Sequence, residues 1–117
     1  HLLSITVSLK DVPKDVSDVI HLFKNWKNPL SDLNLPSAPQ YPLFVYREDH
    51  FPQPLLHADE ERGMRTAIGR IRTSDVLDFS FVAMAHNTVR GAAGGAILNA
   101  ELLVSKELLI PRRTAVS

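Results

Sequence analysis

The sequence contains no cysteine, which excludes disulfide bonds, thiolate zinc sites and thiol nucleophiles within these 117 residues. It also lacks an excess of either charge, since 13 lysines and arginines balance 13 aspartates and glutamates. We therefore expect neither nucleic acid nor a membrane surface as a partner. No apolar run approaches the roughly 20 residues of a membrane-spanning helix, and no signal segment opens the chain. These absences predict a soluble, cytoplasmic protein.

The composition is that of one globular domain. The chain is 44% hydrophobic and 22% charged, which suffices for a single core. It begins at His1, with no initiator methionine, directly in a strand-like pattern. We therefore expect the sequence to be part of a longer protein.

The hydrophobic pattern predicts both strands and helices. Residues 2–10 alternate apolar and polar side chains, the period of a strand with one buried face. Asp15 is placed as the N-cap of an amphipathic helix of about three turns that ends near Trp26. Prolines favour loops over residues 28–42 and 50–63, and the acidic run within the second loop is expected to be solvated. Further strands are expected at 41–46, 65–73 and 79–85, and a long helix from Asn87 or Thr88 to about Glu107.

This order of elements indicates the fold class. The short link between the strands at 65–73 and 79–85 favours an antiparallel hairpin, and no internal repeat is present. We therefore expect an α/β fold in the broad sense, or α+β, with a mixed, largely antiparallel sheet and helices packed on it.

Two groups of polar side chains have alternative interpretations. Alternation in the strand at 65–73 places Ile68, Arg70 and Arg72 on one face, where the arginines could bind phosphate. Exposure to solvent, or pairing with acidic residues across the sheet, is the preferred interpretation. His50 and His57 have acidic neighbours but no recognised metal-ligand spacing, so no metal site is expected.

The segment from His86 to Leu103 combines an expected helix with three glycines, Gly91, Gly94 and Gly95. Each glycine costs a helix roughly 0.5–1 kcal/mol relative to alanine, so a compensating role is expected. Small side chains permit close approach, and a helix N-terminus presents free N–H groups. The residues alone leave two interpretations open: a cofactor lies here, or another helix packs closely with no ligand.

The string NTVRGAA at 87–93 follows an apolar strand and leads into a helix that contains NAEL at 99–102. This segment resembles the C-terminal part of aspartate-semialdehyde dehydrogenases, with the fungal and archaeal branch nearest. The string GRIR at 69–72 agrees with that family in order and spacing. So does the opening strand, in which Ile5 and Val7 stand four and six positions after a histidine.

The resemblance implies the C-terminal catalytic and dimerisation half of a two-domain enzyme built like glyceraldehyde-3-phosphate dehydrogenase. The implied reaction converts L-aspartate 4-semialdehyde, phosphate and NADP to 4-phospho-L-aspartate and NADPH, in threonine, methionine and lysine biosynthesis. Residues 1–86 then belong to the catalytic and dimerisation domain. Residues 87–117 form a helix that packs back on the protein's own nucleotide-binding domain, and the protein is a homodimer or homotetramer.

The resemblance also assigns site residues. His1 matches the family histidine that exchanges a proton while a thiolate from another part of the protein attacks the carbonyl carbon. An imidazole suits this role because it titrates near neutral pH. Asn87 matches the residue that reaches the nicotinamide with an amide that both donates and accepts, and Thr88 and Gly91 complete the implied cofactor site. Alternatively Asn87 caps the helix, a role that Thr88 could take over, and His86 is expected to pack or to hydrogen-bond the backbone.

Several parts of the family pattern lie upstream of His1: the nucleotide-binding turn, the nucleophilic cysteine with its neighbouring glutamine, and a substrate-binding arginine. We therefore expect this chain to be inactive alone and NADP to be bound mainly by another domain. The competing hypotheses are the acyl-phosphate reductase of arginine synthesis, an archaeal acyl-CoA reductase, and a non-catalytic dimerisation module.

Overall fold

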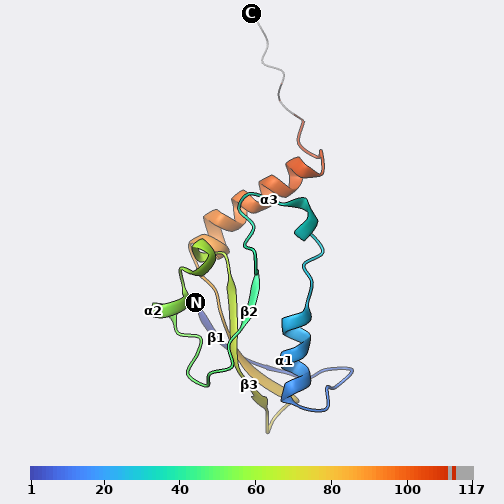
Figure 1. Cartoon of the computed structure of the whole chain (residues 1–117), viewed down its shortest axis with the longest axis vertical. Helices are drawn as coiled ribbons and strands as arrows, with labels where there is room; N and C mark the ends of the chain where they lie inside the picture. The colour runs from blue at the N-terminus through green and yellow to red at the C-terminus, as the bar shows by residue number, and fades with distance from the viewer. Residues whose placement is uncertain (111, 113–117) are drawn as a thin grey trace, which may run out of the picture.

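A computed structural model describes residues 1–110 and 112, and shows a sheet flanked by helices, with one helix projecting from its end (Figure 1). Of the expected C-terminal segment, Pro111 and residues 113–117 lie outside the described residues. Across the part that is described, no helix combines the length and hydropathy needed to cross a membrane. The elements in chain order are β1 (Leu2–Val7), α1 (Val16–Asn25), η1 (Ser31–Leu33), β2 (Leu43–Val45), α2 (Pro54–His57), η2 (Glu60–Gly63), β3 (Thr66–Thr73), β4 (Phe79–Met84), η3 (Val89–Ala93) and α3 (Gly94–Ser105).

The four strands form one sheet in the order β1-β4-β3-β2. Strand β4 pairs antiparallel with β1 and β3, whereas β2 runs parallel to β3. Strand β4 lies inside the sheet, and its side chains Phe79, Val82 and Met84 are buried. The mixed, largely antiparallel sheet and the hairpin of β3 and β4 are therefore confirmed.

Helix α1 packs on one face of the sheet, as its amphipathic pattern predicts. The Asp15 carboxylate accepts a hydrogen bond from the Asp18 amide at 2.9 Å, which confirms the predicted N-cap. Val19 is buried, and the Phe23 ring meets the Phe81 ring edge to face at 5.4 Å between centroids. The apolar stripe of α1 thus packs against β2 and β3 and reaches β4 through Phe23.

The opposite face of the sheet carries the loop that follows β2. Gly69 pairs with Val82, whose side chain points away from α1 because neighbouring residues of a strand alternate between faces. A Cβ on Gly69 would lie 2.2 Å from the carbonyl oxygen of Phe51 and 2.8 Å from Cδ of Pro52. Only a glycine therefore allows the loop to lie this close to β3.

Strand β3 contains a β-bulge beside this contact. Its register against β4 shifts between Gly69 and Arg72, so β3 has one residue more than its partner there. Arg70, within the bulge, has a φ of 52°, in the left-handed region. The expected alternation, with Ile68 and both arginines on one face, is therefore wrong, because the bulge interrupts it.

The two arginines of β3 bind backbone oxygens. Arg70 donates to the carbonyl oxygens of His50 and Pro52, both at 3.3 Å, and Arg72 donates to the Arg70 carbonyl at 3.0 Å. Within residues 1–110 and 112 neither arginine pairs with a carboxylate, contrary to one of the expected alternatives. Arg70 instead fastens the loop to the bulge, and Arg72 is exposed, as the other alternative predicts.

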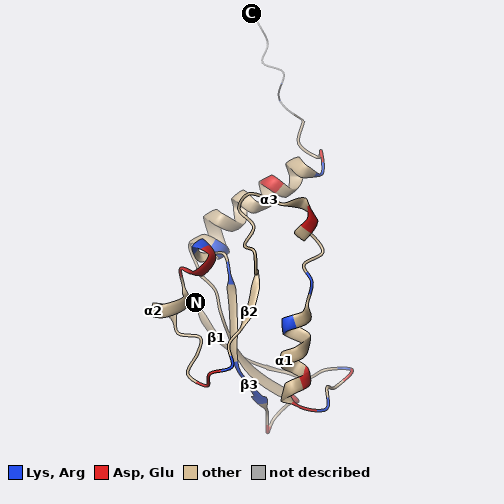
Figure 2. Ribbon diagram, in the orientation of Figure 1, with Lys and Arg blue, Asp and Glu red and all other residues tan. Residues whose placement is uncertain are grey.

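Several expected boundaries also change. The first strand ends at Val7 rather than Lys10, and the second proline-rich loop contains the short helices α2 and η2. The C-terminal helix begins with a π-helical turn, in which the Gly91 amide donates to the His86 carbonyl at 3.0 Å. Regular α-helix starts only at Gly94 and ends at Ser105, two residues before the expected end. Most of the α3 ribbon is uncharged in sequence, as its tan colour in Figure 2 shows.

Candidate functional site

The sheet brings the predicted site residues together from opposite ends of the sequence. The N-terminal amine of His1 donates to the Ala85 carbonyl at 2.8 Å, and the Ala85 amide donates to the His1 carbonyl at 3.0 Å. These bonds extend the β1–β4 ladder by one residue pair, and Asn87 follows two residues later. The antiparallel register therefore places His1 and the turn that contains Asn87 at the same end of the sheet.

The turn that leads into η3 is capped by His86. Neither the Thr88 side chain nor that of Asn87 caps the helix, so both expected alternatives for the cap are wrong. Instead Nδ1 of His86 accepts from the backbone amides of Thr88 at 3.3 Å and of Val89 at 3.2 Å, as a backbone-bonding role predicts. In the described part of the chain the Asn87 amide forms no hydrogen bond, and this residue is exposed.

The three glycines of this segment differ in what surrounds them. A Cβ on Gly94 would lie 2.5 Å from Sδ of Met64, and one on Gly95 would lie 2.6 Å from the Arg90 carbonyl oxygen. Packing therefore explains these two glycines. At Gly91 the nearest atom would be a carbonyl oxygen at 3.6 Å, an ordinary contact, and the residue is exposed. Contacts among the described residues therefore do not require a glycine at 91.

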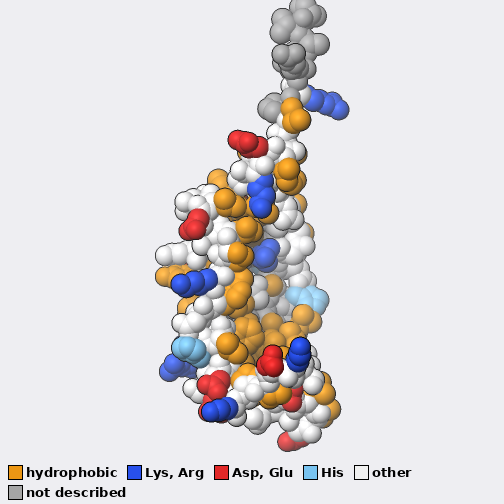
Figure 3. All heavy atoms as spheres, turned by 90° about the vertical axis from the view of Figure 1, so that its right-hand side faces the viewer, with side chains coloured by type: hydrophobic (Ala, Val, Ile, Leu, Met, Phe, Trp, Pro, Cys, Tyr) orange, Lys and Arg blue, Asp and Glu red, His pale blue; other side chains and the backbone are white. Residues whose placement is uncertain are grey.

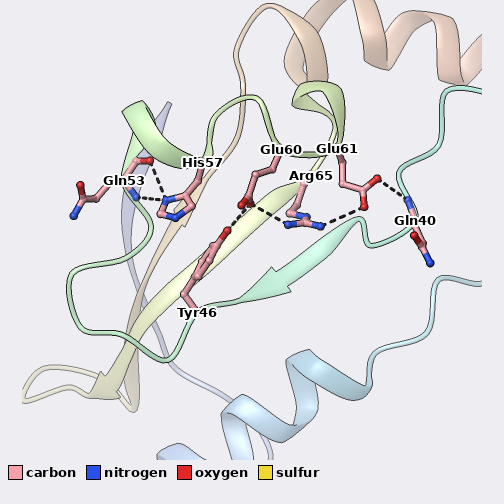
Figure 4. A network of polar contacts seen from close by, with 7 residues as sticks. All are labelled: Gln40, Tyr46, Gln53, His57, Glu60, Glu61 and Arg65. Carbon is pink, nitrogen blue, oxygen red and sulfur yellow. Dashed lines mark hydrogen bonds and ion pairs between the residues drawn. The ribbon is translucent and has the colours of Figure 1, made fainter.

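A network of charged side chains links β2 to the turn before β3 (Figure 4). The Tyr46 hydroxyl donates to the Glu60 carboxylate, which also pairs with Arg65 at 3.0 Å. A second Arg65 nitrogen lies 3.2 Å from Glu61, whose carboxylate also accepts from the Gln40 amide at 3.1 Å. The side chains of Arg65, Glu60 and Glu61 are only 14%, 30% and 21% exposed, so the expectation of a solvated acidic loop is wrong for this part of the run.

The electrostatics of this network indicate a structural role. Burial, then the hydrogen bond to Glu60 and the charge of Glu60, raise the pKa of Tyr46 to about 12. Burial alone would lower the pKa of Arg65, but the contacts with Glu60 and Glu61 outweigh it and raise that pKa. Both groups therefore keep their protons at neutral pH and hold the turn rather than exchange protons with a substrate.

The histidines considered as metal ligands have other surroundings. His57 is buried, and its ring lies 4.5 Å from the Tyr46 ring and 4.6 Å from the Phe51 ring, between centroids. Its Nδ1 accepts from the Gln53 amide at 2.9 Å. In the structure as described, no cluster of three or more histidines, aspartates or glutamates could hold a metal ion.

An apolar groove lies between α1 and the sheet, on the side shown in Figure 3. Its volume is about 690 Å³. Arg90 is the one charged residue among those that line it, and the others are almost all apolar, including Phe23, Trp26 and Phe81. Apart from Thr66 and Arg90 the lining is apolar, so the groove is suited to contact with apolar side chains.

Comparison with known proteins gives the family. Residues 1–90 match the family model described as the semialdehyde dehydrogenase dimerisation domain. The chain is 36% identical to aspartate-semialdehyde dehydrogenase of Schizosaccharomyces pombe over 93% of this chain and 31% of that protein. It is 42% identical to malonyl CoA reductase (NADP) of Metallosphaera sedula over 79% of this chain and 26% of that protein.

A solved structure agrees. The crystal structure of aspartate-semialdehyde dehydrogenase with NADP from Candida albicans matches with a TM-score of 0.80 at 34% identity, over 92% of this chain and 30% of that one. The chain thus spans less than a third of the length of each of these relatives. Because the matched region includes the whole sheet and the start of the glycine-rich turn, the chain belongs to the semialdehyde dehydrogenase family, as its dimerisation domain.

Proposed function

We propose that the chain is the catalytic and dimerisation part of an NADP-dependent, phosphorylating aspartate-semialdehyde dehydrogenase. The overall reaction converts L-aspartate 4-semialdehyde, phosphate and NADP⁺ to 4-phospho-L-aspartate, NADPH and a proton. The observation that carries the proposal is the pairing of His1 with Ala85, because it sets the histidine beside the turn that contains Asn87. The identities to aspartate-semialdehyde dehydrogenases of fungi and archaea support it.

His1 acts as the general acid and base. The 117 residues contain no cysteine, so the nucleophilic thiolate comes from a part of the protein outside this chain. When the thiolate adds to the aldehyde carbon, His1 gives a proton to the oxygen and takes it back as the carbonyl re-forms with loss of hydride. Phosphate then displaces the thiolate from the acyl carbon.

Asn87, Thr88 and Gly91 contribute to the cofactor site. The exposed Asn87 amide has no partner in the described chain, and it offers the donor and acceptor that a carboxamide needs. Gly91 leaves room for close approach. These residues fit the nicotinamide end of NADP, which supplies the hydride acceptor when bound, whereas most of the cofactor is held by a nucleotide-binding domain outside this chain.

The C-terminal helix packs on that nucleotide-binding domain. Helix α3 has no buried residue, and Ile97 and Val104 are 55% and 61% exposed. Such an apolar, uncovered helix is stable only against a further surface. Residues 1–86 form the dimerisation part of a homodimer or homotetramer. A cytoplasmic location remains a prediction.

Malonyl-CoA is the second candidate substrate class, because the chain is 42% identical to a malonyl CoA reductase. That reaction runs in the reducing direction: the enzyme thiolate would displace the CoA thiolate from the acyl carbon, as it would displace phosphate from 4-phospho-L-aspartate, and His1 and Asn87 would keep the same roles. The chemistry of the described residues is common to both, so the substrate must be tested directly.

The test uses the full-length protein that contains this sequence. NADPH formation is followed at 340 nm with aspartate semialdehyde, with and without phosphate, and NADPH consumption is followed with malonyl-CoA. The His1→Asn variant keeps a polar side chain but cannot carry the proton. His21→Asn is the matched control, because His21 is an exposed histidine on α1.

We expect phosphate-dependent NADPH formation that falls at least about 100-fold in His1→Asn, the lower range for loss of a general acid–base. His21→Asn should keep full activity, and the 117-residue chain alone should show none. Turnover with malonyl-CoA only would show that malonyl-CoA, and not aspartate semialdehyde, is the substrate. Full activity of His1→Asn would contradict the role of His1, and no turnover with either substrate would favour a non-catalytic module.

A further inference from the structure

The ring of His86 contacts several polar groups of the turn that contains Asn87. Its Nδ1 lies 3.3 Å from the Thr88 amide, 3.2 Å from the Val89 amide and 3.3 Å from the Thr88 hydroxyl. Two backbone N–H groups donate to this nitrogen, so it carries no proton and the ring proton lies on Nε2. The two backbone bonds close a loop over residues 86–89, with Asn87 inside it.

Other contacts hold the same turn from outside. The His86 carbonyl accepts from the Gly91 amide at 3.0 Å, which closes the π-helical turn. The Val89 side chain lies over Gly63, where a Cβ would be 3.1 Å from Cβ of Val89 and where φ is 76°. Asn87 thus stands on a backbone fixed on both sides, although its own side chain makes no hydrogen bond in the described chain.

We propose that His86 is a positioning residue: by fixing the backbone of residues 86–89, it sets the place from which the Asn87 side chain reaches the cofactor. This inference rests on the proposed function of Asn87. Among the described residues the His86 ring has one acidic partner, Asp59, whose Oδ1 lies 3.7 Å from Nε2. Because the Asp59 side chain is 97% exposed and lies beyond hydrogen-bond distance, it adds little to the hold on the ring.

The experiment measures KM for NADP and kcat in the full-length protein for His86→Ala, Asn87→Ala and the double variant. Loss of the cap should raise KM for NADP about tenfold, which corresponds to one or two lost hydrogen bonds. If His86 acts through Asn87, the double variant has the KM of Asn87→Ala alone. If His86 acts independently of Asn87, the effect of His86→Ala on KM for NADP should instead add in full to that of Asn87→Ala.

Two isosteric variants keep the test decisive if His86→Ala does not fold. In His86→Asn the side-chain amide oxygen takes the place of Nδ1 and can accept the same backbone hydrogen bonds. KM for NADP should therefore stay within about threefold of the value for the unmodified protein. In His86→Gln the amide lies near the place of Nε2, so KM should stay high.

Equal KM values in His86→Asn and His86→Gln, or additive effects in the double variant, would overturn the positioning role. A KM for NADP unaffected by Asn87→Ala would overturn the cofactor role of Asn87 and this inference with it. The two failures are distinguishable because the first leaves the Asn87→Ala effect in place.

Discussion

The close approach of the proline-rich loop to the sheet at Gly69 allows a quantitative prediction. In Gly69→Ala the new Cβ would lie 2.2 Å from the Phe51 carbonyl oxygen and 2.8 Å from Cδ of Pro52. Real Cβ atoms essentially never come within 3.0 Å of such atoms, and one of these two belongs to the backbone. The loop must therefore move away from β3, since no side-chain rotation relieves the contact.

The cost follows from what the loop gives up when it moves. Pro52 is among the most completely buried side chains, and Arg70 donates to the carbonyl oxygens of His50 and Pro52. Overpacking by one carbon costs typically 1–3 kcal/mol, and each weakened hydrogen bond contributes about 1 kcal/mol. We expect Gly69→Ala to destabilise this region by about 2–4 kcal/mol.

Hydrogen exchange in the full-length protein measures this locally, through the free energy of opening of the β3 and β4 amides. Gly91→Ala is the matched control, because a Cβ there makes only an ordinary contact at 3.6 Å and should change stability by less than about 1 kcal/mol. If the β3 amides are equally protected from exchange in Gly69→Ala and Gly91→Ala, the loop contact at Gly69 does not have the predicted cost.

Two further predictions concern the polar contacts. The raised pKa of Tyr46 means that its neutral form stabilises the fold fully below pH 10 and that this contribution is lost as the pH rises towards about 12. Tyr46→Phe should therefore flatten the fall of stability over this range, as measured by urea unfolding at several pH values, and an unchanged slope would contradict the assignment. Glu101 accepts from the Ser37 amide at 2.9 Å and hydroxyl at 2.6 Å, which ties α3 to the loop before β2. Glu101→Ala should speed hydrogen exchange in α3, because it lowers the free energy of opening of this helix by about 1–2 kcal/mol. Glu101→Gln should have an intermediate effect. Unchanged exchange in Glu101→Ala would show that these hydrogen bonds do not hold α3 to the loop.

Local sequence patterns predicted those parts of the fold that local physics controls. The alternation in β1, the helical stripe of α1 with its Asp15 cap, and the hairpin of β3 and β4 all depend on residues close in the chain. The same patterns failed at the bulge around Arg70 and at the π-helical turn, because both adapt the backbone to distant loops. The bulge lets Arg70 bind the backbone of residues 50–52, and the π-helical turn places the Val89 side chain against Gly63.

The sequence by itself determined the fold class through its composition and periodicity. Short strings of residues determined the family resemblance and the residue types of the proposed site. Only the tertiary structure decided that His1 lies beside Ala85, that His86 rather than Asn87 caps the turn, and that the space beside Gly91 would admit a Cβ. It also joined Tyr46 to the acidic turn at Glu60. These relations depend on strand register and on contacts between segments far apart in the chain, and no local pattern encodes the distance between two such segments.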